Sequence, residues 1–185
     1  MESTLACDGD IVFFNNSATN RGGAVRASER SRATWTGGVS FTGNSAGVGG
    51  AVDVSSSSSV VWAGDDGSTF SRNAASDNGG GVHVSNSVVK WHSNSSFEGN
   101  TAGSRGGGLY VSNGKATWEG ESNIRSNTAN SRGGGIYVSN GSISWMGAVS
   151  FFSGNIAHTY GGGLYGNSRS NISWTGKALF SSNVG

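Results

Sequence analysis

The sequence has no proline, one cysteine and few charged residues. Of its 185 residues 12% are charged, and the formal net charge is +1, which argues against a partner held by bulk electrostatics, such as nucleic acid. The single cysteine, Cys7, excludes an intramolecular disulfide. The absence of proline is unusual for a chain so rich in turn-forming residues, and is typical of continuous hydrogen-bonded strand ladders.

Long apolar runs and helical patterns are also absent. No apolar run approaches the roughly 18 residues that a membrane-spanning helix needs, so we expect no direct membrane span in this chain. The opening MESTLACDGD has neither a basic segment nor an apolar core, and so does not read as a signal peptide. No stretch repeats its apolar residues with a period of about 3.6, and the 33 glycines are spread throughout.

What the sequence does contain is a repeat of 27 to 29 residues. The segments NTAGSRGGGLYVSNG (100–114) and NTANSRGGGIYVSNG (127–141) agree at 13 of 15 positions. Tryptophan marks the period most clearly, because all six copies occur in the same setting. Cys7 falls at the tryptophan position of the first unit, so we expect a buried structural thiol and not a reactive one. The six tryptophans are Trp35, Trp62, Trp91, Trp118, Trp145 and Trp174.

Two further motifs follow each tryptophan from Trp35 to Trp145, and the first of them also follows Trp174. A Phe-x-x-Asn motif, with Ile124 as the one substitute for phenylalanine, is followed by a glycine block that reads GGAV, GGGV, GGGL or GGGI. Asparagine tolerates turns, and its amide can bond to the units above and below. We therefore expect an asparagine ladder at a corner of the fold. Its members are Asn44, Asn73, Asn100, Asn127 and Asn155.

Short stretches of alternating apolar and polar residues within each unit indicate strands. Leu109 and Val111 share one face, as do Ile143 and Trp145, and Val39 and Phe41. Three such strands per unit predict an all-β, right-handed parallel β-helix with 27–29 residues per coil, its handedness following the usual crossover preference. Residues 1–185 would form one array of about six and a half coils. A propeller blade needs about 40 residues, and a closed up-and-down sheet or an antiparallel β-roll would not require identical turns.

The paired motifs resemble the repeat region of chlamydial polymorphic membrane proteins, which is marked by GGA(I/L/V) and Phe-x-x-Asn. The complete glycine motifs are Gly22–Val25 and Gly49–Val52, while the other four blocks carry glycine in place of alanine. The resemblance covers nearly the whole chain. It implies an autotransporter-passenger-like β-helix, located outside the cell or at its surface, that acts as an adhesin.

One face of this β-helix is a candidate binding surface. The outward positions of the glycine-block strand are Arg26, Asp53, His83, Tyr110, Tyr137 and Tyr165, and the residues before the glycine blocks are Arg21, Val48, Asn78, Arg105, Arg132 and Tyr160. Towards the C-terminal end, three tyrosines therefore lie beside Arg105, Arg132 and Tyr160. Aromatic rings with guanidinium groups suit glycan or protein contacts. The alternative is that the tyrosines stack only to stabilise the sheet.

No catalytic or metal-binding set emerges from the remaining polar residues. The acids are scattered, and Asp53 stands alone among its outward neighbours. His83, His92 and His158 occupy different positions of the repeat, so they form no ligand set and are expected to be ordinary surface residues. We expect neither a metal nor another cofactor. Ice binding would need a flat threonine array, but the outward position before each tryptophan holds Val61 and Lys90 between Thr34 and Thr117.

These observations favour a non-enzymatic, structural or adhesive surface module that contacts a host or neighbouring cell-surface protein or glycan. The alternative is a polysaccharide-binding or polysaccharide-modifying β-helix domain, and ice binding is a minor one. The sequence starts within the tryptophan strand of one coil and stops before another glycine block. It is expected to be a segment of a longer array, or a unit that stacks head to tail into a filament.

Overall fold

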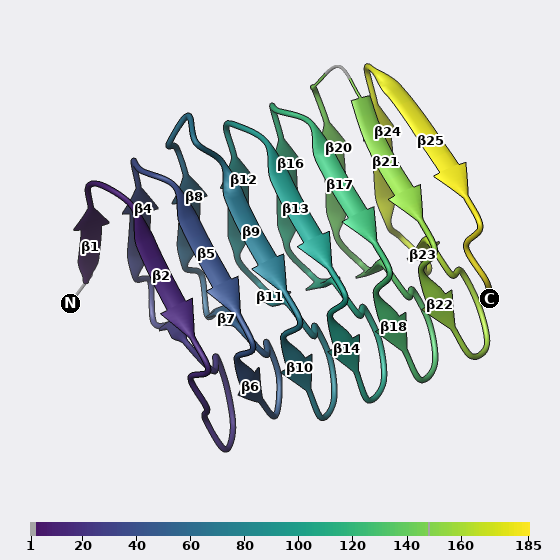
Figure 1. Cartoon of the computed structure of the whole chain (residues 1–185), viewed down its shortest axis with the longest axis horizontal. Coiled ribbons are helices and arrows are strands. Elements are labelled where there is room, and N and C mark those ends of the chain that lie inside the picture. Colours follow the sequence, from purple (N-terminus) through teal and green to yellow (C-terminus); the bar gives the residue numbers. More distant parts are fainter. Residues whose placement is uncertain (1–2, 148) are drawn as a thin grey trace.

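In the computed structural model, which describes residues 3–147 and 149–185, each coil of the chain lies parallel to the next (Figure 1). Every pair of neighbouring strands is parallel and joins equivalent positions of successive repeats. The prediction of an all-β parallel β-helix is therefore confirmed. Among the described residues, no helix is long and apolar enough to cross a membrane.

Two seven-stranded sheets contain the aromatic repeat positions, and we call them the tryptophan sheet and the phenylalanine sheet. The tryptophan sheet comprises β1 (Thr4–Cys7), β4 (Arg32–Trp35), β8 (Ser59–Trp62), β12 (Val88–Trp91), β16 (Lys115–Trp118), β20 (Ser142–Trp145) and β24 (Asn171–Trp174). The phenylalanine sheet comprises β2 (Ile11–Phe14), β5 (Val39–Thr42), β9 (Ser68–Ser71), β13 (Ser95–Glu98), β17 (Ser122–Arg125), β21 (Val149–Ser153) and β25 (Lys177–Ser181).

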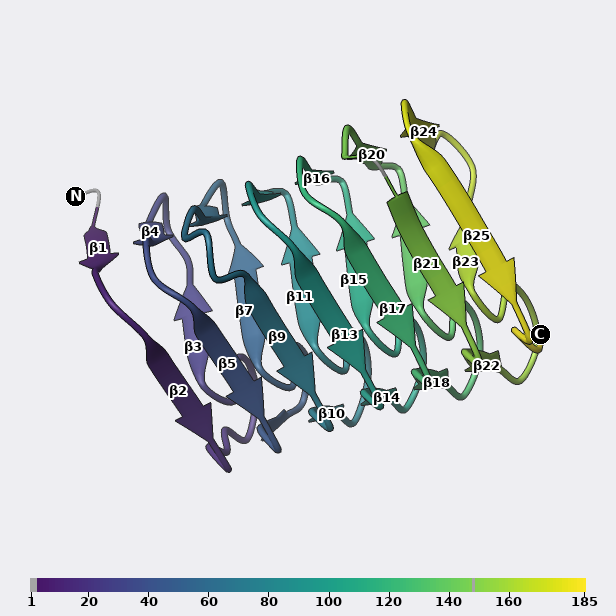
Figure 2. The same cartoon turned by 45° about the horizontal axis from the view of Figure 1, so that its top comes forward.

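Two further sheets complete each coil, and we call them the tyrosine sheet and the short sheet. Figure 2 shows strands of the tyrosine sheet behind those of the phenylalanine sheet. The tyrosine sheet comprises β3 (Val25–Ala27), β7 (Val52–Ser55), β11 (Val82–Ser85), β15 (Leu109–Ser112), β19 (Ile136–Ser139) and β23 (Leu164–Gly166). The short sheet comprises β6 (Ser45–Ala46), β10 (Ala74–Ala75), β14 (Thr101–Ala102), β18 (Thr128–Ala129) and β22 (Ile156–Ala157). The three strands expected in each coil are present. The two-residue strand of the short sheet was not expected from the sequence.

Aromatic ladders fill the core. Trp91 stacks on Trp118 with ring centroids 4.5 Å apart and planes 8° from parallel, and Phe70 stacks on Phe97 at 4.6 Å. Within a coil the two ladders meet edge to face, as Trp91 does with Phe97 at 5.6 Å. A buried tryptophan removes about 150–250 Å² from water, so these ladders are the main apolar contribution to stability.

The predicted asparagine ladder is present at the corner after the phenylalanine sheet. The Asn100 side-chain amide donates to Asn127 Oδ1 at 2.9 Å and to the carbonyl oxygen of Phe70 at 2.8 Å. Both Asn100 and Asn127 are fully buried. The positive φ angle of the corner belongs to the preceding residue, Gly99 or Ser126. Asparagine is therefore required for its amide and not for its tolerance of a left-handed backbone.

The glycine blocks permit close contact between coils. A Cβ atom at Gly107 would lie 2.3 Å from the carbonyl oxygen of Gly134 in the next coil, which is too close for any side chain. The preceding Gly106 has a φ of +66°, a conformation that L-residues rarely adopt. These two constraints recur from coil to coil, which explains why the glycine-rich segments 100–114 and 127–141 are so similar.

The first coil corrects one expectation. Cys7 pairs with Trp35 in the tryptophan sheet, so its position in the repeat is as predicted. However, Cys7 is half-buried and not enclosed. The reason is that β1 has a neighbouring strand, β4, on one side only.

Candidate binding face

The predicted face is assembled on the outer side of the tyrosine sheet. Tyr110 stacks on Tyr137 with centroids 5.2 Å apart, and Tyr137 stacks on Tyr165 at 5.5 Å. Tyr160 lies 6.1 Å from Tyr165, with its plane turned by 30°. Parallel strand register brings these rings together, because Tyr110, Tyr137 and Tyr165 occupy the same position of successive coils.

The stacking determines which parts of the rings are accessible. Tyr137 is only 2% exposed, so it lies beneath the surface and cannot be a direct contact residue as the sequence suggested. Tyr110 and Tyr165 are half-buried, whereas Tyr160 is 57% exposed. The alternative interpretation, that the tyrosines stabilise the sheet by stacking, therefore describes their ring faces correctly. The edges of the outer rings and the ring of Tyr160 remain open to solvent.

Two arginines border the tyrosine ladder. The Arg105 guanidinium carbon lies 5.5 Å from the ring centroid of Tyr137. That of Arg132 lies 5.5 Å from Tyr160 and 5.6 Å from Tyr165. Parallel bridges pair Arg105 with Arg132 and Arg132 with Tyr160. We define the tyrosine–arginine face as Arg105, Arg132, Tyr160, Tyr110 and Tyr165.

The charge on this face has no acidic partner among the residues that the structure describes. Across residues 3–147 and 149–185, no carboxylate oxygen lies within 4.0 Å of the Arg105 or Arg132 guanidinium group. The Nε atoms of both arginines are buried and have no hydrogen-bond partner in that part of the chain. Their described neighbours are aromatic rings, whose faces attract cations.

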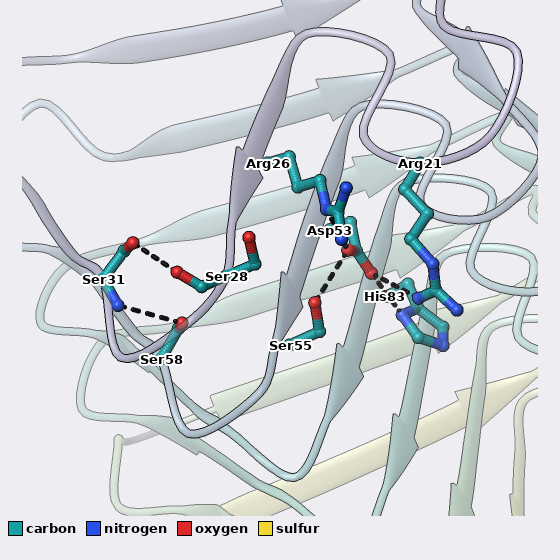
Figure 3. A network of polar contacts seen from close by, with 8 residues as sticks. All are labelled: Arg21, Arg26, Ser28, Ser31, Asp53, Ser55, Ser58 and His83. Atoms are coloured by element: carbon teal, nitrogen blue, oxygen red, sulfur yellow. Dashed lines mark hydrogen bonds and ion pairs between the residues drawn. The ribbon is translucent and has the colours of Figure 1, made fainter. Parts of the chain in front are cut away.

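A different arrangement occupies the N-terminal end of the same sheet. Asp53 is fully buried and accepts a hydrogen bond from Ser55 at 3.0 Å (Figure 3). Its carboxylate also contacts His83 Nδ1 at 2.7 Å, Arg21 Nη1 at 3.4 Å and Arg26 Nε at 3.7 Å. Asp53 is the one acid of its outward row, as the sequence indicates, and its described partners are arginine, histidine and serine side chains.

The histidines differ in their surroundings. His83 is 6% exposed and stacks on Tyr110 at 5.1 Å, so the expectation of an ordinary surface residue is wrong for it. His92 and His158 are exposed, as expected. Within the described part of the chain, no group of three His, Cys, Asp or Glu side chains is placed to hold a metal ion.

Glu119 forms an ion-paired cluster on the tryptophan sheet. Its carboxylate lies 2.6 Å from Lys90 Nζ and 2.6 Å from His92 Nδ1. The hydrogen bond from Lys90, together with the hydrogen bond and charge of His92, outweighs desolvation and lowers the pKa of Glu119 below its usual value of 4.5. Lys90 thus interrupts the outward row that was considered for ice binding, in which Thr117 is only 5% exposed.

An open groove of about 280 Å³ crosses the outer side of the phenylalanine sheet. Thr69, Ser96 and Asn123 contribute to its lining, and Phe151, which is 40% exposed, borders it. Asp66 and Glu121 give this groove two acidic side chains. This groove is separate from the tyrosine–arginine face.

Each of two coils contains a Phe-x-x-Asn corner followed by a buried glycine block. These segments match the Chlamydia polymorphic membrane protein repeat. The matches span residues 10–28 and 94–112. The first contains Phe13–Asn16 and Gly22–Val25, and the second contains Phe97–Asn100 and Gly106–Leu109. The resemblance predicted from the sequence is thereby confirmed. No curated protein and no solved structure matches the chain.

Proposed function

We propose that this chain is a non-enzymatic β-helix module of a cell-surface or extracellular protein, and that it mediates adhesion through the tyrosine–arginine face. The match to a repeat of polymorphic membrane proteins supports the surface location. The observation that carries the adhesive role is the row of Arg105, Arg132 and Tyr160, which presents two guanidinium groups and an exposed ring on adjacent coils.

The rigidity of the coil stack favours binding at this face. Arg105 and Arg132 are held against tyrosine rings, and the tyrosines are held by one another. Ordering a rotamer-rich side chain on association costs about 0.5–1.5 kcal/mol, and much of that cost is already met here. A face of this kind can bind a partner without rearranging.

The acidic residues support a structural rather than a catalytic role. Asp53 is enclosed by cationic side chains, Glu119 pairs with Lys90, and Glu98 pairs with Arg125 at 2.7 Å. Each of these three carboxylates is engaged by a neighbouring coil, whereas Asp66 and Glu121 line the groove of the phenylalanine sheet. A general acid or base would instead face a substrate cleft with an adjusted pKa.

The adhesive role is tested by coating beads with the purified chain and counting the beads that remain on cells after washing. Tyr160→Ser combined with Tyr165→Ser should strongly reduce retention. Phe14→Ser is the matched control, because Phe14 is 63% exposed on the phenylalanine sheet and lies outside the face. Full retention of a folded double variant, judged by tryptophan fluorescence, would refute the role of this face.

The groove on the phenylalanine sheet supports a second candidate, a polysaccharide-binding or polysaccharide-modifying domain. Its small polar lining and the bordering Phe151 suit a sugar ring. A glycan array comparing the chain with a Phe151→Ser variant tests this candidate. Hydrolysis or β-elimination of an acidic polysaccharide by the chain would contradict the non-enzymatic assignment.

A further inference from the structure

Arg105 and Arg132 form a pair of like charges in register. The bridge between them places equivalent backbone positions on adjacent strands, and adjacent strands are about 4.8 Å apart. Both arginines are half-buried. Like charges on neighbouring strands repel each other, and the absence of a described carboxylate partner leaves that repulsion uncompensated within residues 3–147 and 149–185.

The N-terminal end of the same sheet shows how an arginine of this row is neutralised. Arg21 contacts Asp53, which lies 32 residues further along in the next coil. The same offset joins Arg105 to Tyr137. Strand register connects Asp53 to His83, Tyr110 and Tyr137 in turn, so Tyr137 occupies the position that Asp53 holds earlier. The later coils therefore keep the arginine and replace its carboxylate by an aromatic ring.

We infer that the tyrosine–arginine face binds an anionic polysaccharide, whose sulfate or carboxylate groups replace the missing carboxylate beside Arg105 and Arg132. This inference rests on the proposed adhesive face and specifies its ligand. Guanidinium groups bind sulfate and carboxylate through paired, charge-assisted hydrogen bonds. The Nε atoms of both arginines are buried, so the ligand would bind the terminal guanidinium nitrogens.

The spacing of the row favours a polysaccharide over an acidic polypeptide. Arg105 and Arg132 occupy equivalent positions of two adjacent coils, whose backbones lie about 4.8 Å apart. An extended peptide presents side chains on one face only every second residue, at about 6.6–6.8 Å, and so falls out of register with this row. A pyranose unit is close to one coil spacing in length. The exposed ring of Tyr160 provides an apolar surface at the end of the row.

The experiment measures binding of the 185-residue chain to four immobilised polymers: heparin, hyaluronate, polyglutamate and neutral dextran. We expect salt-sensitive binding to heparin, to hyaluronate or to both, and weaker binding to polyglutamate and dextran. Heparin alone would identify sulfate as the ligand group, and hyaluronate at equal strength would identify the carboxylate. Equal or tighter binding of polyglutamate would overturn the choice of a polysaccharide.

Variants locate the site. Arg105→Gln combined with Arg132→Gln should weaken binding by about tenfold or more, because hydrogen bonds to charged groups are lost. Arg32→Gln combined with Arg72→Gln removes the same charge from exposed positions on β4 and directly after β9, and should have little effect. Equal losses from both double variants would show non-specific attraction and overturn the inference.

The outcomes separate this inference from the proposed function. Adhesion of coated beads that soluble heparin and hyaluronate do not reduce, and that survives the Arg105→Gln, Arg132→Gln changes, would overturn the ligand class and leave the adhesive role standing. Specific binding of an anionic polysaccharide without bead adhesion would support the ligand and overturn the adhesive role.

Discussion

The indole N–H of Trp118 donates to Ser95 Oγ at 2.9 Å, and Ser95 lies one coil earlier, at the start of the phenylalanine sheet strand. Trp145 makes the same bond to Ser122 at 3.0 Å. At the equivalent position before Trp62 the chain has Val39, and the Trp62 indole N–H has no partner among the described residues. Some of the buried indole N–H groups along the tryptophan ladder therefore have a hydrogen-bond acceptor among the described residues, and others do not.

Replacing Ser122 with Val should destabilise the fold, because it leaves the buried Trp145 indole N–H without an acceptor. The expected loss is about 1–3 kcal/mol in the free energy of unfolding, measured by urea denaturation followed by tryptophan fluorescence. The converse change, Val39→Thr, places a hydroxyl before Trp62 and should cost less than Ser122→Val, although Ser68 at the equivalent position does not bond to Trp91. A larger loss from Val39→Thr than from Ser122→Val would contradict this account.

Changing Asn127 to Asp should destabilise the corner strongly at neutral pH. The new oxygen would replace an amide nitrogen that donates to the Phe97 carbonyl oxygen and to Asn155 Oδ1, both at 2.9 Å. Burying a carboxylate against two acceptors should cost about 3 kcal/mol or more. Burial raises the pKa of the introduced carboxyl, so the deficit relative to the wild type should shrink as pH falls.

Denaturation of Asn127→Asp at several pH values checks that sign. Asn130→Asp, at an exposed turn position, is the matched control and should change stability little. A deficit for Asn127→Asp that grows on acidification would argue against a buried amide ladder as the source of the effect.

Glu119 should add a small, pH-dependent increment of stability. Its pKa is lowered in the folded state, so the increment is present above its ordinary value of 4.5 and is lost as pH falls through the lower folded value. Because its side chain is 34% exposed, solvent screening keeps the increment below about 1 kcal/mol. Glu119→Gln should lower the melting temperature slightly at neutral pH and not at low pH. Glu121→Gln, at a nearby exposed residue, should have no effect at either pH.

Head-to-tail association of the chain remains a prediction. Phe180, on the outer strand β25, is 50% exposed although its ladder position is buried elsewhere, and Phe13 on β2 is half-buried. A second copy stacked on either end would continue the phenylalanine ladder. Light scattering should then show a molecular mass that rises with protein concentration. Phe180→Glu should abolish that rise, whereas Phe14→Glu, at an outward-facing position, should not. A constant monomer mass for the unmodified chain would rule out stacking.

The core was predictable from the sequence because stacking repeats one environment in every coil. Trp91, Phe97 and Asn100 each recur at fixed spacing, and each is buried with its own kind. The short sheet was not predicted, because a two-residue strand such as Thr101–Ala102 is too brief to show alternation.

The sequence predicted which residues lie together on the candidate face, but not which of them are exposed. Arg105, Arg132 and Tyr165 do lie together, as the two aligned rows indicated. The burial of Tyr137 could not be seen from alternation alone, because its cover comes from Tyr110 and Tyr165 on adjacent strands of the same sheet and from Arg105. Arg21 and Asp53 are 32 residues apart and occupy different positions of the repeat. A comparison of equivalent repeat positions therefore does not reveal their contact.

The hydrogen bonds that join the coils, such as those linking Asn100 to Asn127, connect equivalent residues of adjacent coils and so run along the stacking direction. A force pulling the two ends apart would consequently strain one boundary between coils before the next. Each coil that detaches would free 27 to 29 residues, or about 90–100 Å of extended chain. A tether built in this way would lengthen in discrete steps under load, and the coils that stay stacked would keep their part of the outer face.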